Sequence, residues 1–514
     1  MKKLYISLLL LSTTLLANSQ GVDEAYLFAK ENSFGTARAV GMGGAFGALG
    51  GDMSGVQINP AGVAVFRSPE LTFTPSFQWD NTTSNYYGTQ ADASKFRFTI
   101  NQFGYVGVDR PMREPTSGIV SINYAFNYQR VSDFNTTTQI SGNNIQSSLL
   151  DQFRFEADGT PVDNLDSYRS GLAYDTYLLD QLPGTDINPL YYNALEVVDP
   201  ISGDIVRESP FGVNQWCLIE KRGRVTETGG SAGINISNKL FLGTSLNIAL
   251  ISYDLNTFYS EYNPSKNSSD FFNSFNYNSY IDTEGLGINF KFGAIYKPIE
   301  ALRLGFAFQT PTWYAMTERY SYEMDSYLNG VDTDGNNING AYKLVGGEFD
   351  YNYNTPLKLT GSIGLILGGK VAIDLDYKYI DYSNASYNAT NYDYSSAQQM
   401  TSINNEIKAI YQATNNFNAG IEVKPIPNIA LRGGFIYNQG AIKNSNSDTF
   451  TYSAGIGYRI QNYFVDIAYR LQSQEYTYYP YQLDNSLIAE GFPNQPATVK
   501  NNTSLALFTV GMKF

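Results

Sequence analysis

From Glu70 to the C-terminus, apolar and polar side chains alternate with a period of two residues. The stretch 371–379 shows this most clearly, because every second residue from Val371 is apolar or aromatic while Asp374, Asp376 and Lys378 stand between them. Successive side chains of a β-strand point to opposite faces, so the pattern predicts strands with one apolar and one polar face.

Counting such stretches predicts about fourteen strands. They are 70–79, 95–108, 117–130, 227–237, 240–256, 280–297, 301–319, 349–367, 370–382, 415–424, 428–438, 449–459, 463–474 and 503–514. The predicted connections alternate long and short, beginning with a long loop at 80–94. Transmembrane barrels have short periplasmic turns and long extracellular loops, so this rhythm predicts an even-stranded barrel with both ends periplasmic.

The N-terminus has the features of an export signal. Lys2 and Lys3 precede the apolar run LYISLLLLSTTLLA, and Ala17-Asn18-Ser19 provides a cleavage site before Gln20. After it, no run of about 20 apolar residues follows, so we expect no transmembrane helix. The 41 Tyr and 31 Phe of this exported chain fit the aromatic girdles of an outer-membrane barrel. The chain ends on Phe514, as such barrels often do.

Composition excludes several functions. The net charge of −14 without a basic patch argues against a nucleic-acid partner. The chain has no histidine and one cysteine, so His-based catalysis, a His-ligated haem and an internal disulfide are excluded. We expect no cofactor, no metal and no enzymatic activity, although a Ser/Lys pair stays open.

Residues 35–62 differ from the rest, since nine of these 28 residues are glycine. A dinucleotide-binding fingerprint is absent because Phe46 stands where that motif needs its last glycine. A phosphate loop is absent because no lysine follows the glycines where that motif needs one. Apolar residues such as Met42 and Leu49 predict a packed plug instead of a solvated linker. The segment ends at Asn59-Pro60-Ala61-Gly62, a corner where Pro60 fixes φ and Gly62 permits a positive φ.

The motifs GMGGAF at 41–46, Gly51-Asp52 and Asn59–Gly62 resemble the hatch of the FadL family, outer-membrane channels for long-chain fatty acids and other hydrophobic compounds. The hairpin 288–311 and the strand 371–383 are similar to further segments of that family. The resemblance implies an all-β fold, a transmembrane antiparallel β-barrel of about 14 strands with an N-terminal hatch in its lumen. The implied parts are a signal peptide at 1–19, a hatch at 20–66, and a barrel at 67–514 whose largest extracellular loop is 131–226.

The resemblance also implies passive uptake of hydrophobic molecules, gated by the hatch, with lateral exit through the wall near 118–130 and a movable segment at 20–34. The implied hatch and gating residues are Gly41, Met42, Gly43, Gly44, Ala45, Phe46, Asp52, Asn59, Pro60, Ala61 and Gly62. Phe34, Met42 and Phe46 are candidate ligand contacts, although packing of the plug explains them equally well. We expect Asp52 to bond turn backbone. Inward charges are expected to neutralise one another and hold the hatch, and binding of a substrate carboxylate is the alternative role. They are Arg303, Asp374, Asp376, Lys378, Arg432, Arg459, Asp466 and Arg470.

The implied location is the outer membrane of a Gram-negative bacterium. The implied partners are a hydrophobic ligand such as a long-chain fatty acid, outer-membrane lipid and the barrel assembly machinery, with the protein a monomer. A general diffusion porin and a surface-loop adhesion or structural protein remain the alternatives.

Overall fold

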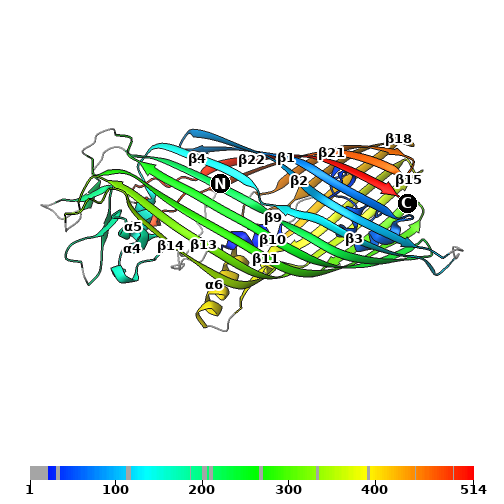
Figure 1. The fold of residues 1–514 in the computed structure, drawn as a ribbon, viewed down its shortest axis with the longest axis horizontal. Helices are drawn as coiled ribbons and strands as arrows, with labels where there is room; N and C mark the ends of the chain where they lie inside the picture. The colour runs from blue at the N-terminus through cyan, green and yellow to red at the C-terminus, as the bar shows by residue number, and fades with distance from the viewer. Residues whose placement is uncertain are drawn as a thin grey trace, which may run out of the picture.

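The computed structural model describes residues 21–30, 35–111, 117–185, 187–199, 205–207, 212–265, 270–331, 335–390, 394–445, 447–489 and 491–514. The predicted signal peptide lies outside this range. The described residues form one elongated barrel, with the C-terminus at one end and the helices α4 and α5 at the other (Figure 1).

Fourteen antiparallel positions make up the wall, as predicted, and β1 pairs with β22 from Glu70 to Asn85 to close it. In chain order the wall consists of β1 (Glu70–Tyr86), β2 (Thr89–Asp109), β3 (Ile119–Asp133), β9 (Val213–Ile236), β10 (Leu240–Tyr262), β11 (Phe272–Ile299), β12 (Leu302–Gln309) with β13 (Trp313–Leu328), β14 (Ala341–Asn354) with β15 (Lys358–Leu367), β16 (Val371–Asp381), β18 (Ala413–Ile426), β19 (Ile429–Asn438), β20 (Thr449–Ile460), β21 (Tyr463–Tyr478) and β22 (Ala497–Lys513).

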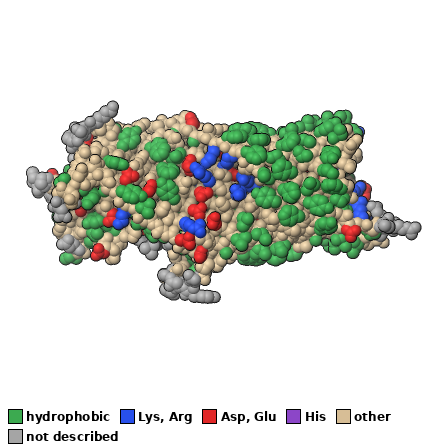
Figure 2. All heavy atoms as spheres, in the orientation of Figure 1, with side chains coloured by type: hydrophobic (Ala, Val, Ile, Leu, Met, Phe, Trp, Pro, Cys, Tyr) green, Lys and Arg blue, Asp and Glu red, His purple; other side chains and the backbone are tan. Residues whose placement is uncertain are grey.

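The two faces of the wall differ as the alternation predicts. Leu246 and Phe98 point outward and are exposed, whereas Asn247 and Asn289 point inward and are buried. Outward apolar side chains form a belt over the half of the barrel that carries the C-terminus, and the other half is mainly polar (Figure 2). This belt is the lipid-facing surface expected of a transmembrane barrel.

The predicted long loop at 80–94 is wrong. β1 and β2 continue to Tyr86 and from Thr89, and they are joined by Tyr87 and Gly88, both at positive φ. A two-residue turn of this kind matches the twist of a hairpin. The polar residues that suggested a loop lie on strands beyond the apolar belt, where outward side chains meet water.

The predicted strands 301–319 and 349–367 are each broken in two. The breaks lie at Thr310–Thr312, between β12 and β13, and at Thr355–Leu357, between β14 and β15. Each contains a proline, Pro311 or Pro356, which has no N–H to donate to a ladder.

The predicted loop 131–226 is largely structured. Its ends are strands, β4 (Thr136–Ile145) and β9, which pair with each other. Between them lies a cap made of α4 (Leu149–Ala157), η2 (Val162–Asn164), α5 (Ser170–Asp175), β5 (Leu179–Gln181), β6 (Tyr191–Asn193), β7 (Glu196–Val198) and β8 (Ile205–Arg207).

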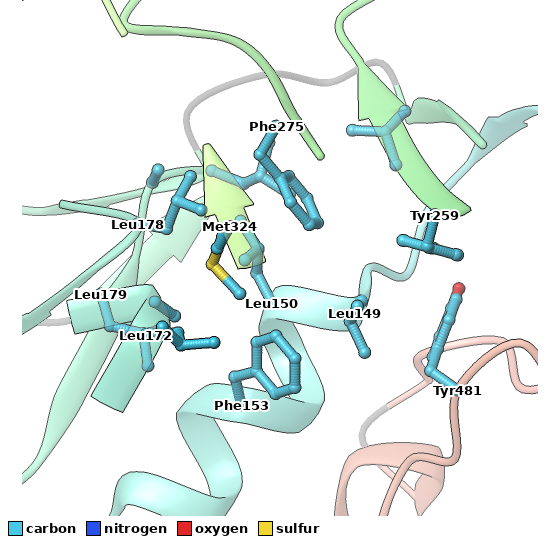
Figure 3. Close-up of a cluster of buried hydrophobic side chains, with 14 of the residues drawn as sticks. Leu149, Leu150, Phe153, Leu172, Leu178, Leu179, Tyr259, Phe275, Met324 and Tyr481 are labelled. Carbon is cyan, nitrogen blue, oxygen red and sulfur yellow. The ribbon is translucent and has the colours of Figure 1, made fainter. Parts of the chain in front are cut away.

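The cap packs across the end of the barrel. Leu150 and Phe153 of α4 meet Phe275 of β11 and Met324 of β13 in one buried cluster (Figure 3). The same cluster reaches Val499 of β22 on the opposite side and includes Leu487 of α7 (Asn485–Ala489). The cap therefore shares an apolar core with the wall and is not a loose loop.

After β16 the chain forms η3 (Tyr382–Asn384), β17 (Ser386–Ala389) and α6 (Tyr394–Ile410). Helix α6 projects from the barrel (Figure 1). In the part of the chain that the structure describes, no helix is long and apolar enough to cross a membrane.

Candidate functional site

The described residues of the predicted hatch lie inside the barrel as short helices: α1 (Val22–Ala29), α2 (Ala37–Gly41), α3 (Met53–Ile58) and η1 (Pro60–Val65). Gly43, Gly44, Gly50 and Gly51 turn the chain between them with φ from 60° to 67°. Such backbone costs other residues energy, which explains the glycine-rich composition.

Two side chains of the predicted hatch motif cap its helices. Asp52 accepts the N–H of Ser54 at 2.9 Å and the hydroxyl of Thr36 at 2.8 Å. Asn59 accepts the N–H of Ala61 at 3.1 Å and donates to the carbonyl of Ala294 in the wall at 3.2 Å. Both residues therefore hold the fold of the hatch, and Asn59 also ties it to β11.

Gly62 does not adopt the positive φ that a glycine permits. Gly62 lies within η1, and only 3.3 Å would separate an added Cβ from the Cα of Gly50. Close backbone approach, rather than a left-handed turn, therefore accounts for this glycine.

Inward carboxylates of β16 grip the hatch backbone. Asp376 accepts the N–H groups of Phe46 and Gly47 at 3.1 and 3.2 Å, and Asp374 accepts those of Ala48 and Leu49 at 3.2 and 3.3 Å. Hydrogen bonds to a charged acceptor are stronger than neutral ones. The prediction that these aspartates hold the hatch is confirmed.

A second contact is a charge network. The hatch residue Arg38 pairs with Glu422 of β18 at 3.0 Å, and Glu422 also pairs with Arg432 at 2.8 Å. Arg432 in turn contacts Asp466 at 2.7 Å, and the side chains of both are fully buried. Buried charges are tolerated when paired in this way, so the network fixes the hatch against β18–β21.

Beside the hatch lies a chamber inside the barrel. Tyr26 and Lys30 of α1 line one part of it, and Gly44, Gln57 and Ile58 of the hatch line another. Its charged lining residues are the cations Lys30, Lys291, Lys358, Lys378 and Arg470 and the anion Glu227. Glu227 is paired with Lys291 at 2.7 Å, so the described lining carries an excess of positive charge.

Amides add to this polar lining, among them Gln129, Asn416, Asn418 and Asn438. A cationic, amide-rich chamber can hold an anionic or hydrogen-bonding group of a ligand. Sequence analysis did not identify Lys30, Lys291 and Lys358 as candidate site residues. The pattern that could have identified them is a lysine at an inward strand position or, for Lys30, at the end of a hatch helix.

The described residues among the predicted ligand contacts lie away from the chamber. Met42 and Phe46 are fully buried within the hatch and do not line the chamber, and Arg38 lies over the ring of Phe46 at 5.2 Å. In this conformation they pack the plug, and their contact with a ligand stays a prediction. Phe34 lies outside the described residues.

The wall has an incomplete ladder next to the chamber. β2 and β3 pair only from Gln102–Gln129 to Asp109–Ile122, and the remainder of β2 pairs with β1 alone among the described residues. Gln129 and Val131, at the end of this ladder, both line the chamber.

A closed β-barrel with an outward apolar belt, an internal plug and a lumenal chamber defines an outer-membrane channel protein. Comparison with known families specifies it further. Residues 224–513 match the family described as "Outer membrane protein transport protein (OMPP1/FadL/TodX)", and the chain belongs to this family of outer-membrane transporters of hydrophobic compounds.

Solved structures share the fold. A FadL homologue from Pseudomonas aeruginosa is 12% identical, with 94% of this chain and 99% of that one covered and a TM-score of 0.54. The toluene transporter TodX of P. putida is 11% identical, with the same coverage and a TM-score of 0.50. No curated protein matches the sequence.

Proposed function

We propose that this protein is a passive, hatch-gated channel that takes up hydrophobic molecules with an anionic head, such as long-chain fatty acids, across the outer membrane. The observation that carries the choice of ligand is the cationic chamber beside the hatch. A carboxylate there gains charge-assisted hydrogen bonds, whereas a neutral hydrocarbon would displace water from ammonium groups without replacing its hydrogen bonds.

Gating is proposed to involve α1, which contributes Tyr26 and Lys30 to the chamber. Its backbone carbonyls accept hydrogen bonds from tyrosines: Tyr411 bonds Val22 at 3.2 Å and Tyr353 bonds Ala25 at 2.5 Å. A ligand head that draws Lys30 away from the ring of Tyr26 competes with the packing of this helix. Movement of α1 then enlarges the chamber.

The exit is proposed to be lateral, where the ladder between β2 and β3 ends. Arg97 of β2 spans the region by pairing with Asp80 and with Asp133, the latter at 3.2 Å. An alkyl chain that passes beside Val131 reaches the lipid without crossing the hatch. Release into the membrane is favourable because each buried CH₂ is worth roughly 0.8 kcal/mol.

A general diffusion porin is the weaker proposal, because buried hatch side chains fill the lumen that such a porin would leave to water.

The test is uptake into proteoliposomes of the mature protein, with radiolabelled oleate, radiolabelled toluene and a small sugar supplied in parallel. We expect oleate flux well above toluene flux, no sugar flux, and faster or unregulated flux when residues 20–34 are deleted. Sugar flux through the intact protein would show that it is a general diffusion porin. Toluene flux equal to that of oleate would show that the ligand needs no anionic head.

A further inference from the structure

The wall strands do not all extend equally far towards the cap. Between the long strands β14, which begins at Ala341, and β21, which ends at Tyr478, lies a group of short ones. Within this group β16 ends at Asp381, β18 begins at Ala413, β19 ends at Asn438 and β20 begins at Thr449. Figure 1 shows the yellow strands of the group only in the half of the barrel that carries the C-terminus. The wall is therefore lower on this side.

The two long strands that flank the short group each have an edge without a partner strand in the described part of the chain. On β21, residues 474–478 pair with β22 alone, because the ladder to β20 stops at Ser473. On β14, residues 341–350 pair with β13 alone, because the ladder to β17 starts at Tyr351.

The inner face of the barrel is open to solvent beside both edges. Asp466 and Ala468 of β21 point inward and are buried, whereas Tyr476 on the same face is 37% exposed. On β14 the inward Tyr351 is buried, and the inward Gly347 is exposed. We call the opening between 341–350 and 474–478 the side window.

The short strands end at the membrane surface. β19 has 10 residues and β20 has 12, close to the roughly 9–11 residues that a strand needs to cross a bilayer. Near the window, outward rings of β18–β20 lie side by side: the ring of Tyr437 is 6.4 Å from that of Phe417 and 5.5 Å from that of Phe450, centroid to centroid. Such a band marks the interface between membrane and water. The side window therefore opens into water just beyond the membrane.

The chamber extends up to the rim that the short strands form. Its lining includes a residue from the outer part of each of them, namely Ile380, Asn416, Asn438 and Thr451. Gln472 of β21 lines it as well. Gln474 lies on the same face of β21, two residues closer to the window, because side chains of a strand alternate. The chamber and the side window are therefore neighbours.

The barrel axis has no comparable opening in the part that the structure describes. Leu150 and Phe153 of the cap and Phe275 of the wall are buried in one cluster across the barrel end (Figure 3). A ligand that moved along the axis would expose these side chains to water, at a cost of roughly 1.5–3 kcal/mol for each. Entry through the side window leaves this cluster intact.

Aromatic rings connect the edge of the window with the hatch. The ring of Phe349 on β14 lies 6.0 Å from that of Tyr320 and 5.5 Å from that of Tyr351. The ring of Tyr353, two residues further along, lies 6.1 Å from that of Phe28 on α1. Phe349 and Tyr320 are only half-buried, so they offer apolar surface to an alkyl chain. The rings lead to α1, the helix that lines the chamber.

We propose that a single-chain carboxylic amphiphile enters the chamber through the side window, from the water on the cap side of the membrane. The choice of ligand rests on the proposed function. Its carboxylate moves on to the lysines of the chamber, and its alkyl chain lies on the aromatic rings behind the window. The cap then serves as a closed roof that directs the ligand to the side.

Gln474 and Glu475 provide a matched pair, because they are neighbours at the edge of β21 and point to opposite faces of the wall. Each is changed to cysteine in the mature protein after its single cysteine, Cys217, is replaced by alanine. A maleimide with a long polyethylene glycol chain is attached in detergent before reconstitution. We expect this label to lower oleate flux at least tenfold in the Gln474→Cys variant and to leave it unchanged in Glu475→Cys. Methyl methanethiosulfonate, which adds only a small group, should leave flux unchanged in both.

Protection of the same cysteines gives a readout that needs no flux. Oleate bound in the chamber extends its chain towards the window, so it should slow the reaction of Gln474→Cys with a small maleimide saturably, at least threefold. The reaction of Glu475→Cys should keep its rate.

Full oleate flux through the labelled Gln474→Cys variant, or equal inhibition in both labelled variants, would overturn the proposed entry. Protection of Gln474→Cys without flux in the unlabelled protein would keep the window as a ligand site and reject the channel. Flux with neither inhibition nor protection would keep the channel and reject the window. Absence of both flux and protection would reject both proposals.

Discussion

The carboxylate of Asp376 on β16 accepts the N–H of Gly47 at 3.2 Å, so one wall side chain fixes the backbone at the centre of the hatch. It also accepts the N–H of Phe46, and Asp374 continues the contact two residues along the strand. The hatch is therefore bound through main-chain groups as well as side chains. Its residues can for this reason be small and its backbone tightly turned.

Replacing Asp376 with alanine should loosen the hatch. Two N–H groups lose a charged acceptor, and each such bond is worth about 1.5–3 kcal/mol. In planar bilayers we expect frequent openings to a larger conductance, while the barrel stays folded. Asp282→Ala removes an exposed outward carboxylate instead and should leave the conductance unchanged. Equal conductance in both variants would show that Asp376 does not hold the hatch.

Lys378→Gln should lower oleate uptake selectively. The substitution removes one positive charge from the chamber and keeps a polar side chain of similar length. The loss of one charge-assisted contact predicts about a tenfold decrease at low ligand concentration. Toluene flux should not fall. Lys343→Gln, whose lysine pairs with Asp175 near the cap and outside the chamber, serves as the control.

Val131→Trp should block the proposed lateral exit. Val131 lines the chamber where the ladder between β2 and β3 ends, so a large side chain there narrows the passage to lipid. We expect the transfer of bound oleate into the bilayer to slow by at least tenfold, whatever change the larger side chain makes to oleate affinity in the chamber. Unaltered transfer together with unaltered binding would place the exit elsewhere.

The cap should be more stable in acid. Beyond the apolar belt, burial raises the pKa of Glu261 to about 7 from 4.5, against the opposing bonds from Ser148 and Tyr259. Because the folded pKa exceeds the unfolded one, stability is highest below pH 4.5 and falls as pH rises to 7, by about 3 kcal/mol. Hydrogen exchange of α4, whose Leu149 N–H donates to Glu261 at 2.9 Å, should therefore speed up over this interval.

Glu261→Gln is the control for that experiment, since it carries no titrating proton and should make exchange of α4 independent of pH after correction for the intrinsic rate. Exchange in the unmodified protein that slows between pH 4.5 and 7 would contradict the assignment.

The sequence alone was sufficient for the architecture. The alternation along strands such as 371–379 follows from the period of a β-strand that has lipid on one face and the lumen on the other. It does not depend on which strand is the neighbour. The inward position of Asp374 and Asp376 followed from it directly. The helix caps at Asp52 and Asn59 are also local, and the hatch motif that contains them pointed to the family.

Only the tertiary structure decided the rest, because the remaining features depend on which distant segments meet. The hairpin at Tyr87 and Gly88 extends beyond the membrane, where the apolar face that marks a strand is no longer needed. The chamber brings together Lys30 of the hatch with Lys291 and Lys378 of the wall. These lysines meet because of the register of the strands and the position of the hatch inside the barrel. The period of the strands is set by local backbone geometry, whereas the site is made by contacts between residues hundreds of positions apart.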